Sequence, residues 1–578
     1  MNKQNIIIDG NNVCRSYVDL LKSRTFKKVL KDFLGEKVER DPKLKRFTAL
    51  FKKTDDIINL LLLLTHHRHD EISETNYGVF CKYIKNPKAF YYFLEKLYHF
   101  WRSYNRYMIK REKFSSSAAK RLPKKFVSAR DMDNLRFLIL ETFRTIAFNG
   151  SGLQNYIFRQ TSAGPEVALL TDYLRIPEKH KLPFDIYDTP AVWTAVLEQP
   201  LIYYTGKNTR SGIMKVNDKD YLAKYGVPKK DFLLFPIYSG TILIFVYVHK
   251  NFLHLGASLA NLFEFADFNA VKRKKPEGIL VFGADPDFFA PDETAGLVKI
   301  YEKLDIVVGA VGNFEEVDYF GYMKKSILTI HNIIQMRAGN LPIHGAMARI
   351  TLKNGAAANI MFVGDSGAGK SETLSALTRN SEVKFIRIII DDMGTVKIQN
   401  DRPIAYGTEI GAFIRMDDLE SGFAFSELDR SIFINPNKKN ARVIIPFADY
   451  TEIIEGLHID ALFYANNYEP VRSSADALSL SDEVESGLKV FREGKRMAKG
   501  TTSEKGLASS YFGNPFGAVQ LTDLHKNIED KIFPFFTKNS VPVGVLRTQL
   551  GIPGMEFKGP EIAAEALLKF IKTIPTKK

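Results

Sequence analysis

Apolar and polar residues follow different patterns in different parts of the chain, and each pattern predicts a kind of structure. Over residues 1–135, apolar and aromatic residues recur at helical spacing and glycines are few, as in NPKAFYYFLEKLYHFWRSYNRYMIKREKF at 86–114. This spacing predicts amphipathic helices. The longest apolar run, IINLLLLL at 57–64, is far shorter than the roughly 20 residues that span a bilayer, so we interpret it as a buried helix.

Short runs of β-branched and aromatic residues, each closed by Gly, Pro or Asp, predict strands from about residue 185 onwards. Examples are DFLLFPIYSGTILIFVYVHK at 231–250 and GILVFGADP at 278–286. From 357 the pattern alternates between strand, loop and helix, and it ends in the amphipathic GPEIAAEALLKFIKTI at 559–574. We therefore expect an α/β (α+β) fold class in three domains, which are helical at 1–135, mixed at 136–340, and again mixed at 341–578.

A glycine-rich loop follows the expected strand ANIMFV in the segment IMFVGDSGAGKSETLSAL at 360–377. It satisfies G-x-x-x-x-G-K-[ST], in which backbone N–H groups hold phosphate oxygens, the lysine reaches the outer phosphates and the hydroxyl ligates Mg²⁺. The predicted nucleotide-binding residues are Gly364, Asp365, Ser366, Gly367, Ala368, Gly369, Lys370, Ser371 and Glu372.

Two adjacent carboxylates, Asp391 and Asp392, close the apolar run KFIRIIIDDMGTV at 384–396, about twenty residues after the loop. Because neighbouring residues of a strand point to opposite faces, we expect one of them to face a metal ion. The other is left as a base or as a group that supports the metal site.

The chain of 578 residues has a net charge of +15 and a pI of about 9.3, which suits nucleic acid, an acidic partner or small anions. We interpret the excess as a mostly solvated surface that also favours phosphorylated or carboxylate substrates, and we do not expect nucleic acid or a membrane as a partner. The two cysteines, Cys14 and Cys81, exclude a disulfide framework and favour a reducing cytoplasm. The opening residues have no secretory apolar core.

The order of motifs over residues 200–570 resembles that of the ATP-dependent phosphoenolpyruvate carboxykinases. Tyr319 precedes GYMKKS at 321–326, and a helix, PIHGAM at 342–347, the glycine-rich loop and IDD at 390–392 follow in turn. TEIGAFIRMDDL at 408–419 and NARVIIPF at 440–447 are similar to further segments of that family. The loop itself also resembles that of HPr kinase/phosphorylase.

This resemblance implies a carboxykinase-like P-loop fold with an additional helical N-terminal domain, a substrate side at 136–340 and a nucleotide and metal side at 341–578. It implies ATP, Mn²⁺ and Mg²⁺ as cofactors and the conversion of oxaloacetate and ATP to phosphoenolpyruvate, ADP and CO₂. The implied metal ligands are Lys325, His344, Asp392 and, beside Mg²⁺, Ser371. The implied catalytic residues are Lys324, Lys370 and Arg442, and Tyr319 and Arg442 are implied to contact the substrate. Asp391 is a further catalytic candidate as the remaining aspartate of the pair, not through the resemblance.

The segment YTGKNTRSG at 204–212 departs from the family, because Lys207 replaces the arginine that binds the substrate carboxylate and Arg210 lies three residues later. Both are candidates for carboxylate binding. The alternative function is that of an HPr-kinase-like phosphotransferase that acts on a protein or another hydroxyl, with one aspartate as the base. A nucleotide-binding regulator without turnover is a third reading. We expect the N-terminal domain to bind a protein partner or to mediate self-association.

Overall fold

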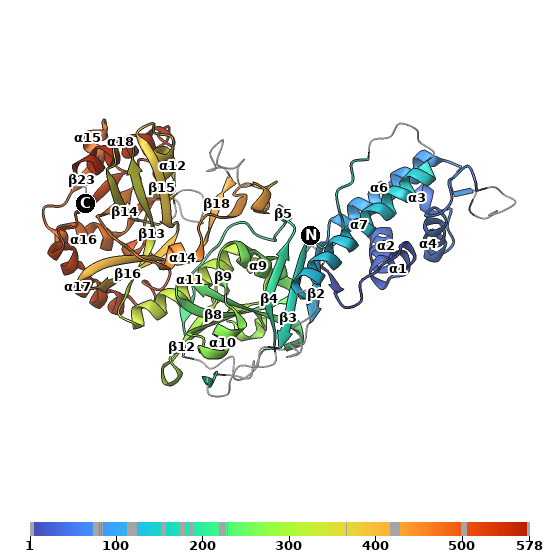
Figure 1. Ribbon diagram of the computed structural model, residues 1–578, viewed down its shortest axis with the longest axis horizontal. Coiled ribbons are helices and arrows are strands. Elements are labelled where there is room, and N and C mark those ends of the chain that lie inside the picture. Colours follow the sequence, from blue (N-terminus) through green and yellow to red (C-terminus); the bar gives the residue numbers. More distant parts are fainter. Residues whose placement is uncertain are drawn as a thin grey trace. The chain divides into compact units, whose positions relative to one another are not determined.

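The computed structural model describes residues 5–574 except 73–79, 81, 84, 112–123, 152–157, 174–179, 184–188, 219–226, 228, 366, 417–427 and 499–505 (Figure 1). Helices and strands are both abundant, so the mixed α/β class is confirmed. Among the described residues no helix has the length and apolar character needed to cross a membrane. The chain divides into two units, which we call unit 1 (1–172 and 194–198) and unit 2 (173–193 and 199–578).

Unit 1 combines helices with three parallel strands in the order β1-β2-β3. Its core is rich in aromatic residues, with the Phe26 and Trp101 ring centroids 5.7 Å apart and those of Phe33 and Phe93 also 5.7 Å apart. The elements are β1 (Asn5–Asp9), α1 (Tyr17–Lys22), α2 (Arg24–Glu36), α3 (Pro42–Thr48), α4 (Thr54–Leu63), α6 (Pro87–Arg102), β2 (Asn105–Arg111), α7 (Lys124–Ser151) and β3 (Val167–Tyr173).

The buried helix expected at 57–64 is confirmed as α4, but the helical reading of 86–114 is wrong beyond α6. Residues 105–111 form β2 because β1 and β3 pair with it on both sides. The expected boundary at 135 lies inside α7, where buried Leu135, Ile139 and Phe143 pack with the core of unit 1. The finer three-domain division stays a prediction.

The first sheet of unit 2 has neighbouring strands in the order β7-β8-β10-β12-β11-β6, and α11 (Phe320–Arg337) packs on β10 and β12. The paired β7 and β8 confirm the strands expected at 231–250. The strands are β6 (Lys215–Val216), β7 (Phe232–Ser239), β8 (Ile242–His249), β9 (Glu264–Phe265), β10 (Gly278–Ala284), β11 (Leu297–Tyr301) and β12 (Ile306–Gly312), with helices α9 (Leu253–Ser258) and α10 (Phe268–Arg273). Strand β4 (Pro190–Leu197) belongs to unit 2 at 190–193 and to unit 1 at 194–197.

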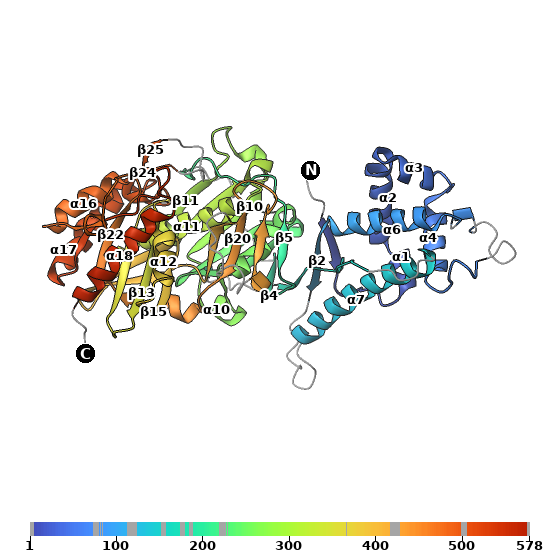
Figure 2. The same cartoon turned by 90° about the horizontal axis from the view of Figure 1, so that it is seen from above.

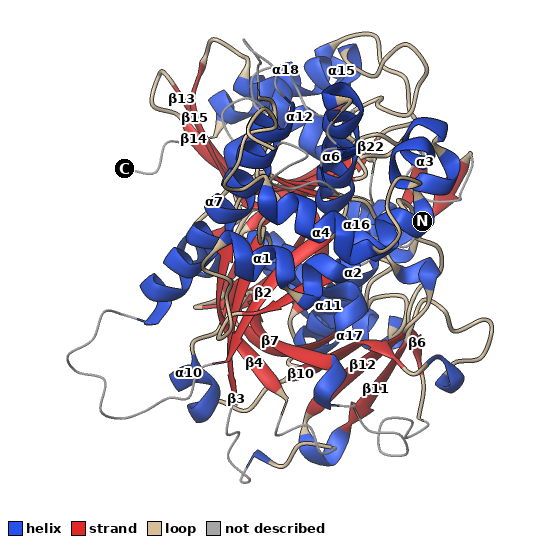
Figure 3. Ribbon diagram, turned by 90° about the vertical axis from the view of Figure 1, so that its right-hand side faces the viewer, coloured by secondary structure: helices blue, strands red, loops and turns tan. Residues whose placement is uncertain are grey.

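The second sheet of unit 2 has the order β21-β17-β16-β13-β14-β22-β26-β23, and β15 pairs with β13 (Figure 3). Helices α12 (Lys370–Thr378) and α18 (Lys558–Thr573) pack against each other beside it. The strands are β13 (Leu341–Leu352), β14 (Ala357–Val363), β15 (Val383–Ile390), β16 (Met393–Gln399), β17 (Arg402–Gly407), β21 (Leu457–His458), β22 (Ala461–Asn466), β23 (Leu478–Leu480) and β26 (Val543–Arg547).

A small third sheet has the order β18-β20-β19-β5, so β19 lies between β5 and the strand that begins at Arg442. Its strands are β5 (Leu201–Tyr203), β18 (Gly411–Arg415), β19 (Ile432–Ile434) and β20 (Arg442–Pro446). The remaining elements are α14 (Tyr450–Ile454), α15 (Ser474–Ala477), α16 (Val484–Glu493), the two-stranded β24 (Lys495–Met497) and β25 (Leu507–Ser509), and α17 (Thr522–Lys538).

Candidate functional site

The glycine-rich loop connects β14 to α12, as its sequence predicts. Lys370 is buried, and its Nζ donates to the main-chain oxygens of Gly364 at 2.6 Å and Asp365 at 3.1 Å. Burial lowers the pKa of Lys370, whereas the nearby carboxylates of Asp392 and Asp365 oppose this shift. Gly369 has φ 92°, and a Cβ there would lie 2.4 Å from the Thr548 hydroxyl, so this turn requires glycine.

Three side chains that the sequence analysis did not identify hold the loop in shape. Asn467 Nδ2 donates to the Gly367 oxygen at 2.8 Å, and Thr548 Oγ1 donates to the Ala368 oxygen at 2.7 Å. Arg496, itself buried, donates through Nε to Asp365 Oδ2 at 2.8 Å. They come from positions about 100 to 180 residues further along the chain, so no local motif indicates them.

The other predicted nucleotide-binding residues lie around the first turn of α12. Ala368 is buried, Glu372 is half-buried and Ser371 is exposed, which leaves the Ser371 hydroxyl accessible to a ligand. Ser366 lies outside the described residues.

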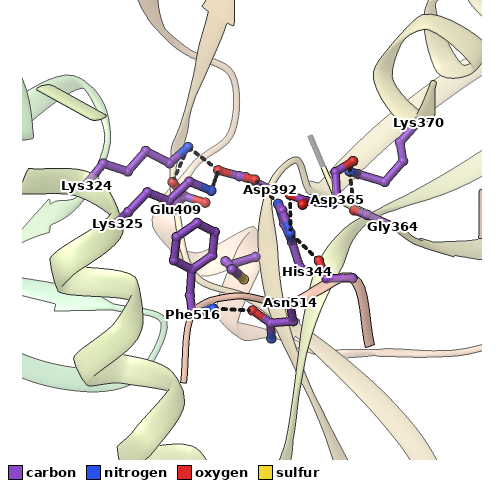
Figure 4. Close-up of polar contacts among 12 residues, drawn as sticks. Lys324, Lys325, His344, Gly364, Asp365, Lys370, Asp392, Glu409, Asn514 and Phe516 are labelled. Carbon is purple, nitrogen blue, oxygen red and sulfur yellow. Dashed lines mark hydrogen bonds and ion pairs between the residues drawn. The ribbon is translucent and has the colours of Figure 1, made fainter. Parts of the chain in front are cut away.

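Asp392 joins three of the predicted site residues (Figure 4). It lies in the turn between β15 and β16, and its Oδ2 is 2.8 Å from Lys324 Nζ and 2.6 Å from Lys325 Nζ. Its Oδ1 is 2.9 Å from His344 Nε2. The two lysines come from the first turns of α11, and the histidine comes from β13. Four residues separated by up to 68 positions thus meet at one carboxylate.

The pKa values of the two lysines in this cluster shift in opposite directions. Burial lowers the pKa of Lys325 to about 8, with the charge of Lys324 adding to the shift and Asp392 opposing it. For Lys324, burial would also lower the pKa, but two carboxylates outweigh it and raise the pKa above its usual value. Burial alone would raise the pKa of Asp392, yet both ammonium groups hold it well below its usual range. A neutral Lys325 amine is therefore accessible near neutral pH.

Glu409 supplies the second carboxylate and was not identified from the sequence. Its Oε1 lies 2.8 Å from Lys324 Nζ, and its side chain is almost fully buried. Burial raises the pKa of Glu409 to about 7, against the pull of Lys324. The segment TEIGAF that carries Glu409 resembles a segment of the family named above, but the spacing of its residues does not predict a buried, paired glutamate.

The hydrogen-bond partners of His344 bear on whether this cluster could hold a divalent cation. The two ring nitrogens of His344 face a carbonyl oxygen, that of Gly513 at 2.7 Å from Nδ1, and a carboxylate oxygen, that of Asp392. Burial lowers the pKa of His344, and a neutral imidazole has only one N–H to offer these two acceptors. Donation from Nδ1 to a carbonyl, with Nε2 left for a metal, is the usual arrangement of a ligating histidine.

Among the described residues there is no group of three or more His, Cys, Asp or Glu that could hold a metal ion. The cluster at Asp392 contains one histidine and one aspartate, and its other nitrogen donors are lysines. Its capacity to bind a cation therefore depends on a neutral Lys325, which the lowered pKa favours.

Tyr319, at the start of α11, and Arg442, at the start of β20, form a second group near Lys324. Tyr319 is buried at the start of α11 and is hydrogen-bonded to Arg442. Burial raises the pKa of Tyr319, whereas Arg442, Arg210 and Lys324 pull it down, so three cations act on one phenol. The Arg442 guanidinium lies 5.3 Å from the Phe413 ring, and its buried Nε has no hydrogen-bond partner among the described residues.

The two candidates for carboxylate binding have different surroundings. Arg210 is half-buried, and its guanidinium carbon lies 5.0 Å from the centroid of the Phe516 ring, while Lys325 Nζ lies 4.4 Å from the same centroid. A small pocket is lined by Arg210, Met214, Tyr322, Lys325, Thr329 and Phe516. Lys207 is exposed, and its described contacts are made by its main chain. The structure thus brings Arg210, and not Lys207, to the lysine cluster.

Asp391 lies beside the cluster without joining it. Burial raises its pKa, while Lys324 and Lys370 lower it and Asp392 adds to the rise. Its carboxylate makes no hydrogen bond or ion pair with the residues that the structure describes. Of the two adjacent aspartates, Asp392 is therefore the one engaged with the histidine and the lysines. Both lie in the turn between β15 and β16, so the expected alternation along a strand does not apply to them.

The segment 511–516 covers His344 and Lys325 and is anchored from α17. The Tyr511 hydroxyl donates to Glu529, which is fully buried and also accepts from Arg492 Nε at 2.9 Å. His525 Nδ1 lies 3.3 Å from the same glutamate. Burial raises the pKa of Glu529 to about 7, whereas Arg492 lowers it.

Replacing Glu529 by glutamine should flatten part of the pH dependence of stability. The folded state keeps a proton on Glu529 that the unfolded chain loses near pH 4.5, so this group destabilises the protein increasingly from about pH 4.5 to about pH 7. The free energy of unfolding of the variant minus that of the wild type should therefore rise over this range and then level off. Urea titrations at each pH measure it, and a difference independent of pH would contradict the prediction.

No protein-family model matches the chain, and a search of curated proteins also gives no match.

Proposed function

We propose that the chain is a divergent ATP-dependent phosphoenolpyruvate carboxykinase, with a carboxykinase-like P-loop fold in unit 2. The observation that carries this proposal is the meeting of Lys324, Lys325 and His344 on Asp392, beside the nucleotide loop of Lys370. A nucleotide loop alone would suit any kinase. The added lysine and histidine cluster and the Tyr319–Arg442 pair suit a small anionic substrate that loses a carboxylate.

The proposed reaction has two bond exchanges. In oxaloacetate, the bond to the carboxylate that leaves as CO₂ breaks, and its electron pair forms an enolate. The enolate oxygen then bonds to the γ-phosphorus of ATP while the bond to ADP breaks. Lys324 and Arg442 would hold the anionic substrate, and Lys370 would neutralise the charge on the phosphoryl group during transfer.

The proposed cations are Mn²⁺ held by Lys325, His344 and Asp392, and Mg²⁺ beside the Ser371 hydroxyl. When bound, these ions supply positive charge to the enolate oxygen and to the nucleotide phosphates. The chain contributes the neutral imidazole of His344, the Asp392 carboxylate and the Lys325 amine, which must lose its proton to bind a cation, and Gly513 orients the imidazole through its carbonyl.

One observation favours the alternative of an HPr-kinase-like phosphotransferase acting on a protein or another hydroxyl. Burial raises the pKa of Asp391, the charges of Lys324 and Lys370 act on it, and it forms no ion pair in the described part of the chain, which suits a base for an attacking hydroxyl. Carboxykinase chemistry does not need this base. The compartment we propose for either activity is the reducing cytoplasm.

The test of the proposed function is the direct detection of phosphoenolpyruvate from oxaloacetate and ATP with Mn²⁺ and Mg²⁺. We expect product with the wild type and none with Lys370→Ala. ATP binding without phosphoenolpyruvate would contradict the carboxykinase proposal. In that case, loss of phosphoryl transfer to an added hydroxyl acceptor in Asp391→Asn would support the kinase alternative.

Arg210 should bind the substrate carboxylate, and Lys207 is its matched control. Because Arg210 lies over Phe516 beside Lys325, Arg210→Ala should lower kcat/KM for oxaloacetate by about a hundredfold, the equivalent of about 3 kcal/mol for a charge-assisted bidentate pair. Lys207→Ala should change it less than threefold or so, as expected for an exposed charge. Steady-state kinetics measure both variants, and a larger loss for Lys207→Ala would reverse the assignment.

A further inference from the structure

The net positive charge of the chain comes almost entirely from its first 172 residues. They hold 32 Lys and Arg against 18 Asp and Glu, a net charge of +14, whereas the whole chain has a net charge of +15. The excess is therefore not a general property of the surface. It belongs to unit 1, and the proposed carboxykinase chemistry in unit 2 does not account for it.

Part of this charge lies on one face of unit 1. Residues 92, 96, 100 and 104 recur every fourth position along and just beyond α6, so they lie on one stripe about 18 Å long at 1.5 Å per residue. Helices α2 and α3 pack against α6, and both views show them beside it (Figures 1 and 2). Their side chains contribute to the same face.

Lysine side chains cover the aromatic rings of this stripe. Lys43 Nζ lies 5.6 Å and Lys96 Nζ 5.3 Å from the centroid of Tyr92. Further along, Lys37 Nζ lies 5.8 Å from Phe100, and Lys28 Nζ lies 5.6 Å from Tyr104. We call Lys28, Lys37, Lys43 and Lys96 the basic surface. Their apolar stems pack on the rings, which places the ammonium groups on the outside.

Two carboxylates of this face, Asp41 and Asp32, are engaged by neighbouring groups, whereas Glu36, whose charge also acts on Tyr104, is exposed. Asp41 accepts from the Tyr92 hydroxyl at 2.7 Å and caps α3 through its other oxygen. Asp32 accepts from the Tyr104 hydroxyl at 2.9 Å and from Lys28 Nζ at 2.7 Å. Lys37, Lys43 and Lys96 form no ion pair within 4 Å with the residues that the structure describes. Three of the four ammonium groups thus remain for an external anion.

We propose that the basic surface of unit 1 binds the phosphodiester backbone of a nucleic acid. This differs from the expectation drawn from the net charge of the whole chain, because that number does not show where the charge lies. Contact surfaces for nucleic acid are polar and strongly positive, and most of their hydrogen bonds go to phosphates.

The composition of the face distinguishes this partner from two others. Insertion into a membrane uses exposed apolar side chains beside the basic ones, and interfaces between proteins have an apolar centre. Among the described residues, α2, α3 and α6 expose no large apolar side chain; the most exposed ones of unit 1, Phe137 and Phe148, belong to α7. An array of lysines without exposed large apolar side chains beside it suits a polyanion.

The test uses the full-length chain and labelled 24-nucleotide RNA, single-stranded DNA and duplex DNA, followed by fluorescence anisotropy between 50 and 300 mM KCl. The variant carries Lys28→Gln, Lys37→Gln, Lys43→Gln and Lys96→Gln, because glutamine removes the charge but keeps an apolar stem over each ring. The matched control removes four exposed lysines of unit 2 with Lys489→Gln, Lys526→Gln, Lys531→Gln and Lys558→Gln.

We expect the wild type to bind with an affinity that falls steeply with salt. The basic-surface variant should lose about 30-fold in affinity at 100 mM KCl, and its slope of log K against log salt should be smaller by about 3, at about 0.7 to 0.9 for each lost phosphate contact. The unit 2 variant should bind within about twofold of the wild type. Comparing the three probes identifies the preferred form of nucleic acid.

Three outcomes would overturn the proposal. They are no binding of any probe by the wild type at 50 mM KCl, an equal loss in the two lysine variants, or tighter binding to vesicles with anionic lipid than to every nucleic acid. Circular dichroism spectra that match the wild type establish that the variants are folded. Because phosphoenolpyruvate formation is measured separately, failure of this proposal is distinct from failure of the proposed function.

Discussion

Asp392→Asn should reduce kcat for phosphoenolpyruvate formation by about a thousandfold or more, which is the size of effect expected when a preorganised charge is removed from a catalytic site. The asparagine keeps the shape of the side chain but not its charge. Lys324 and Lys325 would then face each other without the carboxylate that now lies 2.6 to 2.8 Å from both. His344 would also lose the partner of its Nε2. The measurement is steady-state turnover at saturating oxaloacetate and ATP.

The control for this prediction is Asp391→Asn, which changes the adjacent carboxylate that makes no ion pair in the described part of the structure. It should retain turnover within about tenfold if carboxykinase chemistry is correct. Because leaving a buried charge without its partner costs about 3–5 kcal/mol, Asp392→Asn should also melt at a lower temperature. Assays are therefore run well below its Tm. Wild-type turnover in folded Asp392→Asn would exclude this cluster as the catalytic centre.

Lys370→Met should abolish measurable phosphoryl transfer, with a loss of about a thousandfold or more, while the protein remains folded. Methionine fills similar space but cannot donate to phosphate oxygens or to the two loop oxygens that Lys370 now contacts. Single-turnover formation of phosphoenolpyruvate with the enzyme in excess measures the chemical step. Lys353→Met, at an exposed turn before β14, is the matched control and should behave as the wild type.

A second readout separates binding from chemistry in the Lys370 variant. Equilibrium binding of ATP should weaken moderately, because the backbone amides of the loop remain, whereas transfer should fail. If ATP affinity and the transfer rate of Lys370→Met both matched the wild type, the loop between β14 and α12 would not be the nucleotide site. That outcome would remove both candidate functions.

The features that the sequence predicts well are those encoded by neighbouring residues. The loop motif predicts a strand before it and a helix after it, and β14 and α12 are these two elements. The runs of β-branched and aromatic residues at 231–250 likewise predict strands, which form the paired β7 and β8. By contrast, NRYMIKR at 105–111 reads as a continuation of a helix. It is a strand because two neighbouring strands pair with it, which no local pattern records.

The residues of the candidate site also divide into those that the sequence predicts and those that depend on distant contacts. The family resemblance, through the order of its motifs, predicts four site residues, Lys324, Lys325, His344 and Asp392. The structure brings their side chains together, and their roles as ligands stay predictions. Glu409, Asn467, Arg496 and Thr548 were missed. Each acts through one contact with a residue far away in the sequence, and burial in the fold, rather than spacing, gives that contact its strength.

The main chain of β13 connects the glycine-rich loop to the cluster at Asp392. The amide of Gly364 donates to the His344 oxygen at 3.0 Å, and the amide of Gly345 donates to the Asp392 oxygen at 3.0 Å. Each bond continues the pairing of β13 by one residue beyond a neighbouring strand, β14 for Gly364 and β16 for Asp392, and such added pairing restricts local opening. The loop, the histidine and the aspartate therefore behave as one rigid block. Any closure around a bound substrate has to come from elements that approach this block, namely α11 with its two lysines and the segment 511–516 with Phe516.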